Sequence, residues 1–159
     1  MFDKTVGVSL EDVLFLIEEK IESGGEVTFS PKGISMMPLI KPGRDIVTLV
    51  KNDKELKKGD ILFYRRDNGK FILHRLIRFK NDKLVMCGDN QGFLEFGIER
   101  RNIIAVVKKV TRKGKDVNFD SFLYKLYVKM LVLKRFKINM FSLRYPKAVL
   151  RRIRRLIKK

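Results

Sequence analysis

The sequence has very few of the residues that build disulfide frameworks and metal centres. Among its 159 residues there is one cysteine, Cys87, and one histidine, His74. A single cysteine excludes a disulfide within the chain, and one cysteine with one histidine falls short of the ligand set of a structural zinc site. We therefore predict no metal and no other cofactor, and we expect Cys87 to be a small buried residue of a strand.

Long apolar runs are also lacking. The longest, residues 13–17 and 130–133, are far shorter than the ~20 residues that a membrane-spanning helix needs. The amino-terminal residues MFDKTVGVSLEDV do not have the basic and then apolar pattern of a secretory signal. The sequence therefore predicts a cytoplasmic protein.

Acidic residues are scarce in the last third of the chain. Residues 1–107 contain 18 Lys/Arg and 16 Asp/Glu, whereas residues 108–159 contain 18 Lys/Arg and 2 Asp/Glu, so nearly all of the net charge of +18 lies in the second segment. Hydrophobic residues make up 45% of the chain, which is typical of a folded protein. We predict a near-neutral domain over 1–111 and a basic extension over 112–159.

The first domain is predicted to contain one helix followed by strands. Apolar residues recur at helical spacing over 10–23, between Ser9 and the glycines at 24 and 25. Short β-rich runs follow, separated by turn residues such as Asp67-Asn68-Gly69. They predict strands at 26–30, 45–50, 60–65, 70–80, 83–87 and 102–111. Strands at this spacing favour a curled antiparallel sheet or a partial barrel.

The extension is predicted to be helical. After Gly114 one helix carries an apolar stripe of Phe122, Leu126, Met130 and Leu133. A second helix is predicted over 147–159, where an apolar face opposes the side chains of Arg151, Arg152, Arg154, Arg155 and Lys158. The predicted fold class is thus mainly β, with one N-terminal helix and a basic helical C-terminal extension.

The residues FSPKGISMMPLIKPGRDIV, at 29–47, place Ser35 among glycine and proline. A serine hydroxyl is a poor nucleophile until a base removes its proton, and the one histidine of the chain lies in the apolar strand KFILHRLIRF. Strand alternation places His74 on one face with Ile72 and Leu76, and Arg75 on the other. Taken singly, Ser35 fits a turn residue and His74 a core residue.

This interpretation changes when the order of four motifs is considered. The motifs are, in chain order, GISMMPLI, GDILFY, LHRLI and CGDN. The region from about 29 to 110 resembles the type I signal peptidases and the related SOS-repressor autoproteases and phage-repressor-like peptidases. Ser35-Met36-Met37-Pro38 matches the Ser-Met-x-Pro motif of the nucleophile, and Gly59-Asp60-Ile61 matches the next motif. His74-Arg75-Leu76-Ile77 is similar to the motif of the endoplasmic-reticulum and archaeal branch, which uses histidine in place of lysine as the base.

The resemblance leaves two candidates for the acidic residue that orients the histidine. In that branch a Gly-Asp-Asn motif is followed, six residues after its Asp, by a second acidic residue. Here the motif is Gly88-Asp89-Asn90, and the second position is Glu95 rather than the usual Asp. We place Glu95 ahead of Asp89, which would then hold the turn, but the two roles can be exchanged.

Two features depart from the family pattern. Many signal peptidases have Ser-Gly-Ser at the nucleophile, whereas this chain has Gly33 and Ile34 before Ser35. The oxyanion hole is therefore expected to rely on backbone N–H groups, with Gly33, Ile34, Met36 and Pro38 as the positioning residues around Ser35. The chain also shows no amino-terminal membrane anchor.

The resemblance implies a serine peptidase that cleaves a peptide or protein substrate. An alternative is a catalytically silent binding module of the same fold, whose basic extension binds nucleic acid or membrane; the sequence has no helix-turn-helix before its β region. In the last predicted helix of the extension, basic residues lie on one face and an apolar stripe on the other. This is the pattern of a helix that lies on an anionic surface. We therefore expect peripheral attachment to the inner membrane face ahead of nucleic-acid binding, because the last helix lacks stacking aromatic residues.

Overall fold

The computed structural model describes residues 10–137, and the side chains of residues 15–135. Its elements in chain order are α1 (Leu10–Glu22), β1 (Val27–Phe29), β2 (Asp45–Val50), β3 (Ile61–Arg65), β4 (Phe71–Lys80), β5 (Lys83–Cys87), β6 (Glu95–Ile98), η1 (Arg100–Asn102), β7 (Ile103–Arg112), β8 (Lys115–Asp116) and α2 (Phe122–Lys137). The six predicted strands coincide with β1 to β5 and β7. The predicted helix at 147–159 lies outside the described residues.

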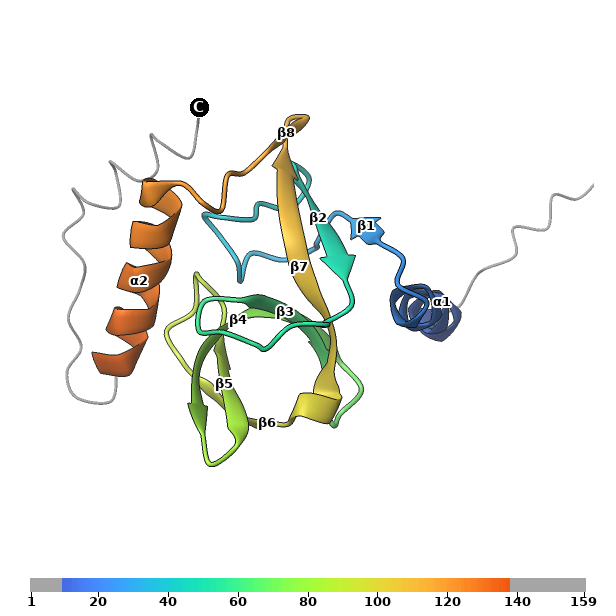
Figure 1. Cartoon of the computed structure of the whole chain (residues 1–159), viewed down its shortest axis with the longest axis horizontal. Helices are drawn as coiled ribbons and strands as arrows, with labels where there is room; N and C mark the ends of the chain where they lie inside the picture. Colours follow the sequence, from blue (N-terminus) through green and yellow to red (C-terminus); the bar gives the residue numbers. More distant parts are fainter. Residues whose placement is uncertain (1–9, 138–159) are drawn as a thin grey trace, which may run out of the picture.

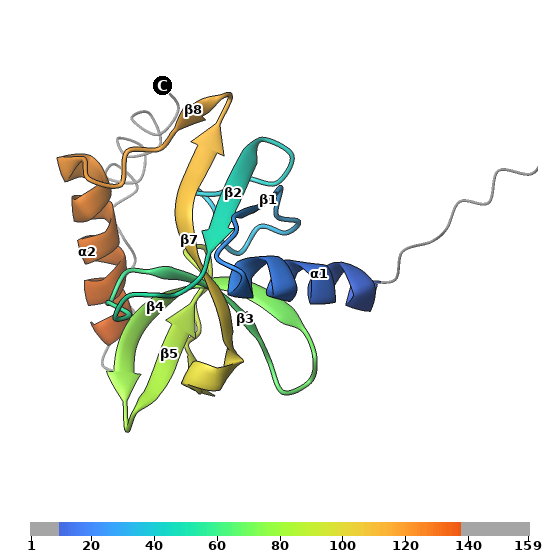
Figure 2. The same ribbon diagram turned by 45° about the vertical axis from the view of Figure 1, so that its right-hand side comes forward.

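The strands form one antiparallel sheet in the order β1-β2-β7-β3-β4-β5-β6, and β8 pairs with β7. Figures 1 and 2 show α1 and α2 at opposite ends of the molecule, with the strands between them. The predicted class, mainly β with an N-terminal and a C-terminal helix, is confirmed. Within residues 10–137 no helix is both long and apolar enough to cross a membrane.

The predicted curling into a partial barrel is wrong, because the sheet is open. The edge strands of the sheet are β1 and β6, and within the described residues these two strands do not pair with each other. Both are short: β1 makes three register pairs with β2, and β6 makes two with β5 around an irregularity. Strands of this length leave too few backbone groups to close the sheet on itself.

Turn residues explain the central antiparallel unit β3–β4–β5. Asn81 and Asp82 both have positive φ, at 50° and 59°, in the two-residue connection between β4 and β5. Positive φ at both central positions is the geometry of the hairpin turn that matches strand twist. In the preceding hairpin Leu62 pairs with His74, so the histidine lies in the middle of the sheet.

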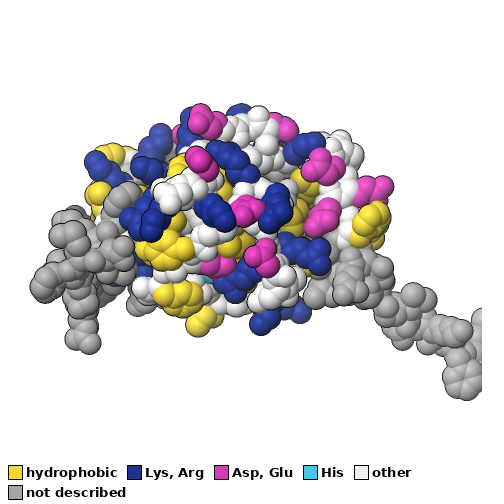
Figure 3. All heavy atoms as spheres, turned by 90° about the horizontal axis from the view of Figure 1, so that it is seen from below, with side chains coloured by type: hydrophobic (Ala, Val, Ile, Leu, Met, Phe, Trp, Pro, Cys, Tyr) yellow, Lys and Arg dark blue, Asp and Glu magenta, His cyan; other side chains and the backbone are white. Residues whose placement is uncertain are grey.

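Two hydrophobic clusters follow the strand alternation of β3 and β4. The larger contains Phe63 and receives Ile21 from α1 and Tyr127 from α2. The smaller contains Tyr64 and Leu76 on the side of the sheet that His74 also faces. The predicted alternation, with His74 and Leu76 on one face, is therefore confirmed. Outside these clusters, the face that points away from β8 mixes Lys and Arg with Asp and Glu (Figure 3).

Candidate functional site

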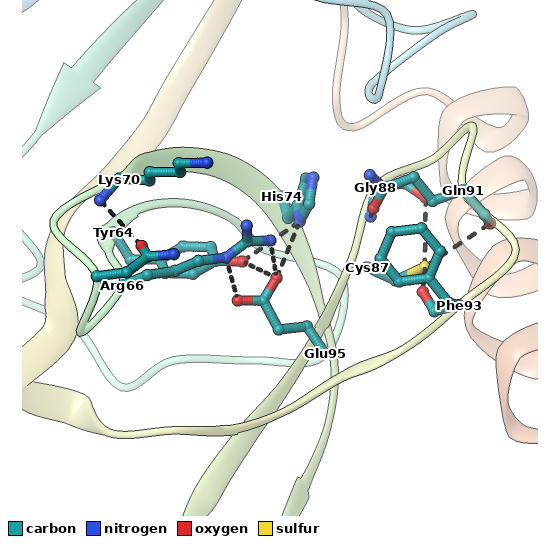
Figure 4. Close-up of polar contacts among 10 residues, drawn as sticks. Tyr64, Arg66, Lys70, His74, Cys87, Gly88, Gln91, Phe93 and Glu95 are labelled. Carbon is teal, nitrogen blue, oxygen red and sulfur yellow. Dashed lines mark hydrogen bonds and ion pairs between the residues drawn. The ribbon is translucent and has the colours of Figure 1, made fainter.

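His74 lies in the middle of β4 with only 2% of its surface exposed. Its Nδ1 is 3.3 Å from the hydroxyl of Tyr64 and 3.8 Å from Oε2 of Glu95. Tyr64 comes from β3 and Glu95 from the first position of β6, so three strands supply one polar cluster (Figure 4). The nitrogen Nε2, on the other side of the ring, points away from Glu95.

The hydrogen bonds of this cluster determine which ring nitrogen of His74 carries the proton. Glu95 accepts two hydrogen bonds from the guanidinium of Arg66 and one, at 3.0 Å, from the hydroxyl of Tyr64. Because the tyrosine donates its single hydrogen to the carboxylate, its oxygen can only accept from His74. The neutral imidazole therefore carries its hydrogen on Nδ1 and leaves a lone pair on Nε2.

Electrostatics set the charge state at both ends of this chain of hydrogen bonds. Burial lowers the pKa of His74 to about 4, against the opposite effect of the Glu95 carboxylate. Burial by itself would raise the pKa of Glu95, but the hydrogen bonds from Arg66 and Tyr64 outweigh it and hold that pKa below its usual value. At neutral pH His74 is therefore a free base and Glu95 an anion.

Ser35 lies between β1 and β2, in the half-buried turn that follows Gly33. Its carbonyl oxygen accepts a hydrogen bond from the N–H of Asn90 at 2.7 Å. A Cβ placed on Gly88 would come within 2.7 Å of the same oxygen, so only glycine permits this approach. Arg75 pairs with Cys87 at the end of β5, and Gly88 therefore leaves the sheet beside His74.

These contacts place the backbone of Ser35 against Gly88 and Asn90, in the loop that follows the Arg75–Cys87 pair of β4 and β5. Among residues 15–135, Ser35 Oγ makes no hydrogen bond with the imidazole. Nucleophile and base are often not yet bonded in the absence of substrate. The backbone N–H groups of Ser35 and Met36 also donate no hydrogen bond within the described residues.

The other predicted positioning residues differ in their surroundings. Gly33 has φ of 105°, a left-handed conformation that favours glycine. Ile34 is exposed, Met36 belongs to the larger hydrophobic cluster, and Pro38 is half-buried after a cis peptide bond.

Asp89 has different partners from Glu95. Its two carboxylate oxygens accept hydrogen bonds from the guanidinium of Arg75, at 2.8 and 2.7 Å, and one also accepts from the hydroxyl of Tyr127 at 2.9 Å. Arg135 of α2 donates to the carbonyl oxygens of Gly88 and Asp89. Asp89 thus ties the loop after β5 to β4 and α2, and it is Glu95 that approaches the imidazole.

Cys87 fixes the other end of the same loop. It is buried at the end of β5, as predicted, and its thiol donates to the carbonyl oxygen of Phe93 at 3.0 Å. Burial raises the pKa of this thiol, which therefore stays protonated and unreactive at neutral pH. The loop that Cys87 holds leads directly into Glu95 (Figure 4).

Sequence reasoning missed Tyr64 and Arg66. The signal for Tyr64 was the β3–β4 hairpin: Tyr64 pairs with Ile72, two residues from His74 on the same face. Diagonal neighbours on one face are within reach of an aromatic side chain, so aligning the two strands would have identified the tyrosine. The partnership between Arg66 and Glu95 has no such local signal, since 29 residues separate them.

The described residues contain no group of three or more His, Cys, Asp or Glu placed to hold a metal ion. They bring together a neutral histidine and an ionised carboxylate linked to it through a tyrosine. The backbone of Ser35 packs against the loop between β5 and Glu95. No protein-family model, no curated protein and no solved structure matches this chain.

Proposed function

We propose that the protein is a serine endopeptidase of the signal-peptidase type, with Ser35 as nucleophile and His74 as base. The observation that carries the proposal is the order of hydrogen bonds from Glu95 through Tyr64 to His74. This order places the imidazole hydrogen on Nδ1 and leaves Nε2 able to accept a proton. A histidine with only a packing role would not need an ionised carboxylate to fix its tautomer.

In the proposed reaction Ser35 Oγ attacks the carbonyl carbon of a peptide bond while His74 Nε2 accepts the hydroxyl proton. The oxyanion that forms accepts hydrogen bonds from the N–H groups of Ser35 and Met36, and one good donor is worth about 3–4 kcal/mol. The proton on Nε2 then passes to the leaving amine, and an ester remains on Ser35. Water, deprotonated by the same nitrogen, hydrolyses this ester and restores the serine.

Glu95 acts through Tyr64 in this proposal. When Nε2 takes up a proton the imidazole becomes a cation, and the negative charge of Glu95 at 3.8 Å from Nδ1 stabilises it. Asp89 has a positioning role, because it holds the loop whose Asn90 N–H binds the Ser35 carbonyl.

Covalent labelling with a fluorophosphonate, read as intact mass and located by peptide mapping, tests the proposal. We expect one adduct on Ser35, none in Ser35→Ala, and labelling at least a hundredfold slower in His74→Ala, since a positioned base contributes about 10²- to 10⁴-fold. Ser23→Ala is the matched control, because that hydroxyl is exposed and donates to the carbonyl oxygen of Lys20 in the last turn of α1.

The alternative of a silent binding module predicts a different result. A folded protein whose Ser35 does not react, or reacts equally well without His74, would rule out the peptidase and leave the binding module as the better explanation of the fold.

A further inference from the structure

Helix α2 has apolar side chains on two sides. Its inner side inserts Tyr127 and Leu131 into the larger hydrophobic cluster. On the outer side Phe122, Leu126 and Leu133 have exposed fractions of 77%, 40% and 51%. Their spacing of four and seven residues aligns them along one face of the helix. A helix that is apolar on both sides normally has both sides covered.

The charged residues of α2 all have one sign. Its sequence, FLYKLYVKMLVLKRFK, contains Lys125, Lys129 and Lys134 but no Asp or Glu. Lys125 and Lys129 are exposed, and they lie next to the apolar stripe. The face shown in Figure 3 differs, since basic and acidic side chains are interspersed on it. The outer side of α2 therefore combines exposed apolar groups with lysines, of which Lys125 pairs at 3.2 Å with Asp120, just before the helix.

We propose that this outer face of α2 binds an anionic phospholipid bilayer, with Phe122, Leu126 and Leu133 in the acyl region and the lysines at the headgroups. An apolar stripe flanked by lysines is the pattern of helices that lie in a membrane interface. Each cation near an anionic membrane surface strengthens such binding.

Two other partners fit this face less well. The chain's own residues 138–159 contain eight Lys/Arg and no Asp or Glu, so packing them on α2 would bring like charges together. Single-stranded nucleic acid would satisfy the lysines, but it binds by stacking on aromatic rings. Phe122 is the one aromatic residue among the large exposed hydrophobic side chains of α2 in the described part of the chain.

The test uses the full-length protein and a tryptophan reporter, because the natural chain has no tryptophan. Phe122→Trp places the reporter on α2, and Phe15→Trp is the matched control, since Phe15 is 66% exposed on α1 at the opposite end of the molecule (Figure 1). Both variants are mixed with vesicles of phosphatidylcholine, with and without phosphatidylglycerol. Vesicles with brominated acyl chains report whether the indole enters the apolar layer.

We expect the emission of Phe122→Trp to shift to shorter wavelength and to be quenched by brominated lipid on anionic vesicles only, while Phe15→Trp is unchanged. A second pair of variants tests the same face without a reporter. Leu126→Ser with Leu133→Ser should lower partitioning onto anionic vesicles at least tenfold, whereas Leu16→Ser, also exposed on α1, should not. All five substituted positions are exposed, and an unchanged thermal midpoint verifies that each of the four variants is folded.

Several results would overturn the proposal. If the reporter on α2 stays in water on anionic vesicles, or if both leucine substitutions leave partitioning unchanged, the helix does not enter the bilayer. A single-stranded oligonucleotide is added to the same samples. If it releases the protein from the vesicles and changes the emission of the α2 tryptophan, the partner of this face is nucleic acid. The same conclusion follows if the oligonucleotide shifts that emission and vesicles do not. These outcomes are independent of whether Ser35 reacts with a serine-directed probe.

Discussion

Replacing Glu95 by glutamine is expected to move the hydrogen of His74 from Nδ1 to Nε2. In the native cluster Tyr64 donates to Glu95 and accepts from His74. A glutamine retains one oxygen for Arg66 and turns its NH₂ group towards the tyrosine. Tyr64 would then accept from the amide and donate to Nδ1, so Nε2 would carry the hydrogen and lose its function as a base.

The size of the effect follows from the geometry. A wrong histidine tautomer costs about 10⁴-fold when an acid bonds the imidazole directly. Here the carboxylate is 3.8 Å from Nδ1 and acts through a hydroxyl at 3.3 Å, so we expect labelling of Ser35 to slow by about 10²- to 10³-fold. The free energy of unfolding should fall by only about 1–2 kcal/mol, because Arg66 keeps a hydrogen bond to the amide oxygen.

Nitrogen NMR measures the tautomer directly, since His74 is the only histidine and its ring signals need no assignment. At neutral pH the natural protein should show a protonated Nδ1 and an unprotonated Nε2, and Glu95→Gln should show the reverse. Glu99→Gln is the control, because it makes the same chemical change at a half-buried carboxylate that pairs with Lys83 and Arg101 rather than with the His74 cluster. A natural protein with its hydrogen already on Nε2 would refute the reasoning, as would a glutamine variant that keeps the native tautomer.

Three further results are expected. The folded pKa of His74 is about 4, below its ordinary value of 6.5, so the rate of Ser35 labelling should stay constant down to about pH 5 and fall with a midpoint near 4. Between these two pH values the histidine is protonated in the unfolded chain but not in the folded protein, so the free energy of unfolding should decrease by about 1.4 kcal/mol per pH unit as the pH falls from 6.5 to 4. In urea titrations a His74→Gln variant should lack this contribution to the pH dependence. An equal pH dependence of the two proteins would contradict the assigned pKa. Gly88→Ala places a methyl group against the Ser35 carbonyl and should abolish labelling, whereas Gly92→Ala, which meets no atom within 4 Å, should label normally; normal labelling of both would show that the close contact does not position the serine. Tyr127→Phe removes a hydroxyl that bonds a buried carboxylate and should lower the denaturation free energy by about 1–3 kcal/mol together with the labelling rate, and a stability loss at full labelling rate would limit the role of α2 to folding.

Much of the fold was predictable from local features of the sequence. The runs that became β2, β3, β4, β5 and β7 are long enough to show strand composition, and Asn81-Asp82 marks the turn between β4 and β5 without reference to the rest of the chain. The short strand β6 was not predicted. It contains Gly97 with φ of 84°, and its pairing with β5 depends on tertiary contacts rather than on strand propensity.

The different roles of Glu95 and Asp89 could not be decided from sequence. Both follow the same strand, and both positions fit the family pattern to which the chain is similar. The distinction comes from Tyr127 of α2, which lies 38 residues beyond Asp89 in the chain and bonds its carboxylate. A partner at that separation leaves no periodic signal, and only the packing of α2 on the larger cluster brings it into place.

The register of the sheet also implies an order in which the site is assembled during folding. The pairs that bring Tyr64, His74 and Cys87 together join neighbouring strands, so they close short loops. Placing Ser35 requires β2 to pair with β7, where Asp45 meets Arg112, and loops of that length form late because closing them costs more chain entropy. For the proposed peptidase we therefore expect His74 to be in place before Ser35 during folding, so that the two proposed catalytic side chains would meet only in the fully folded protein.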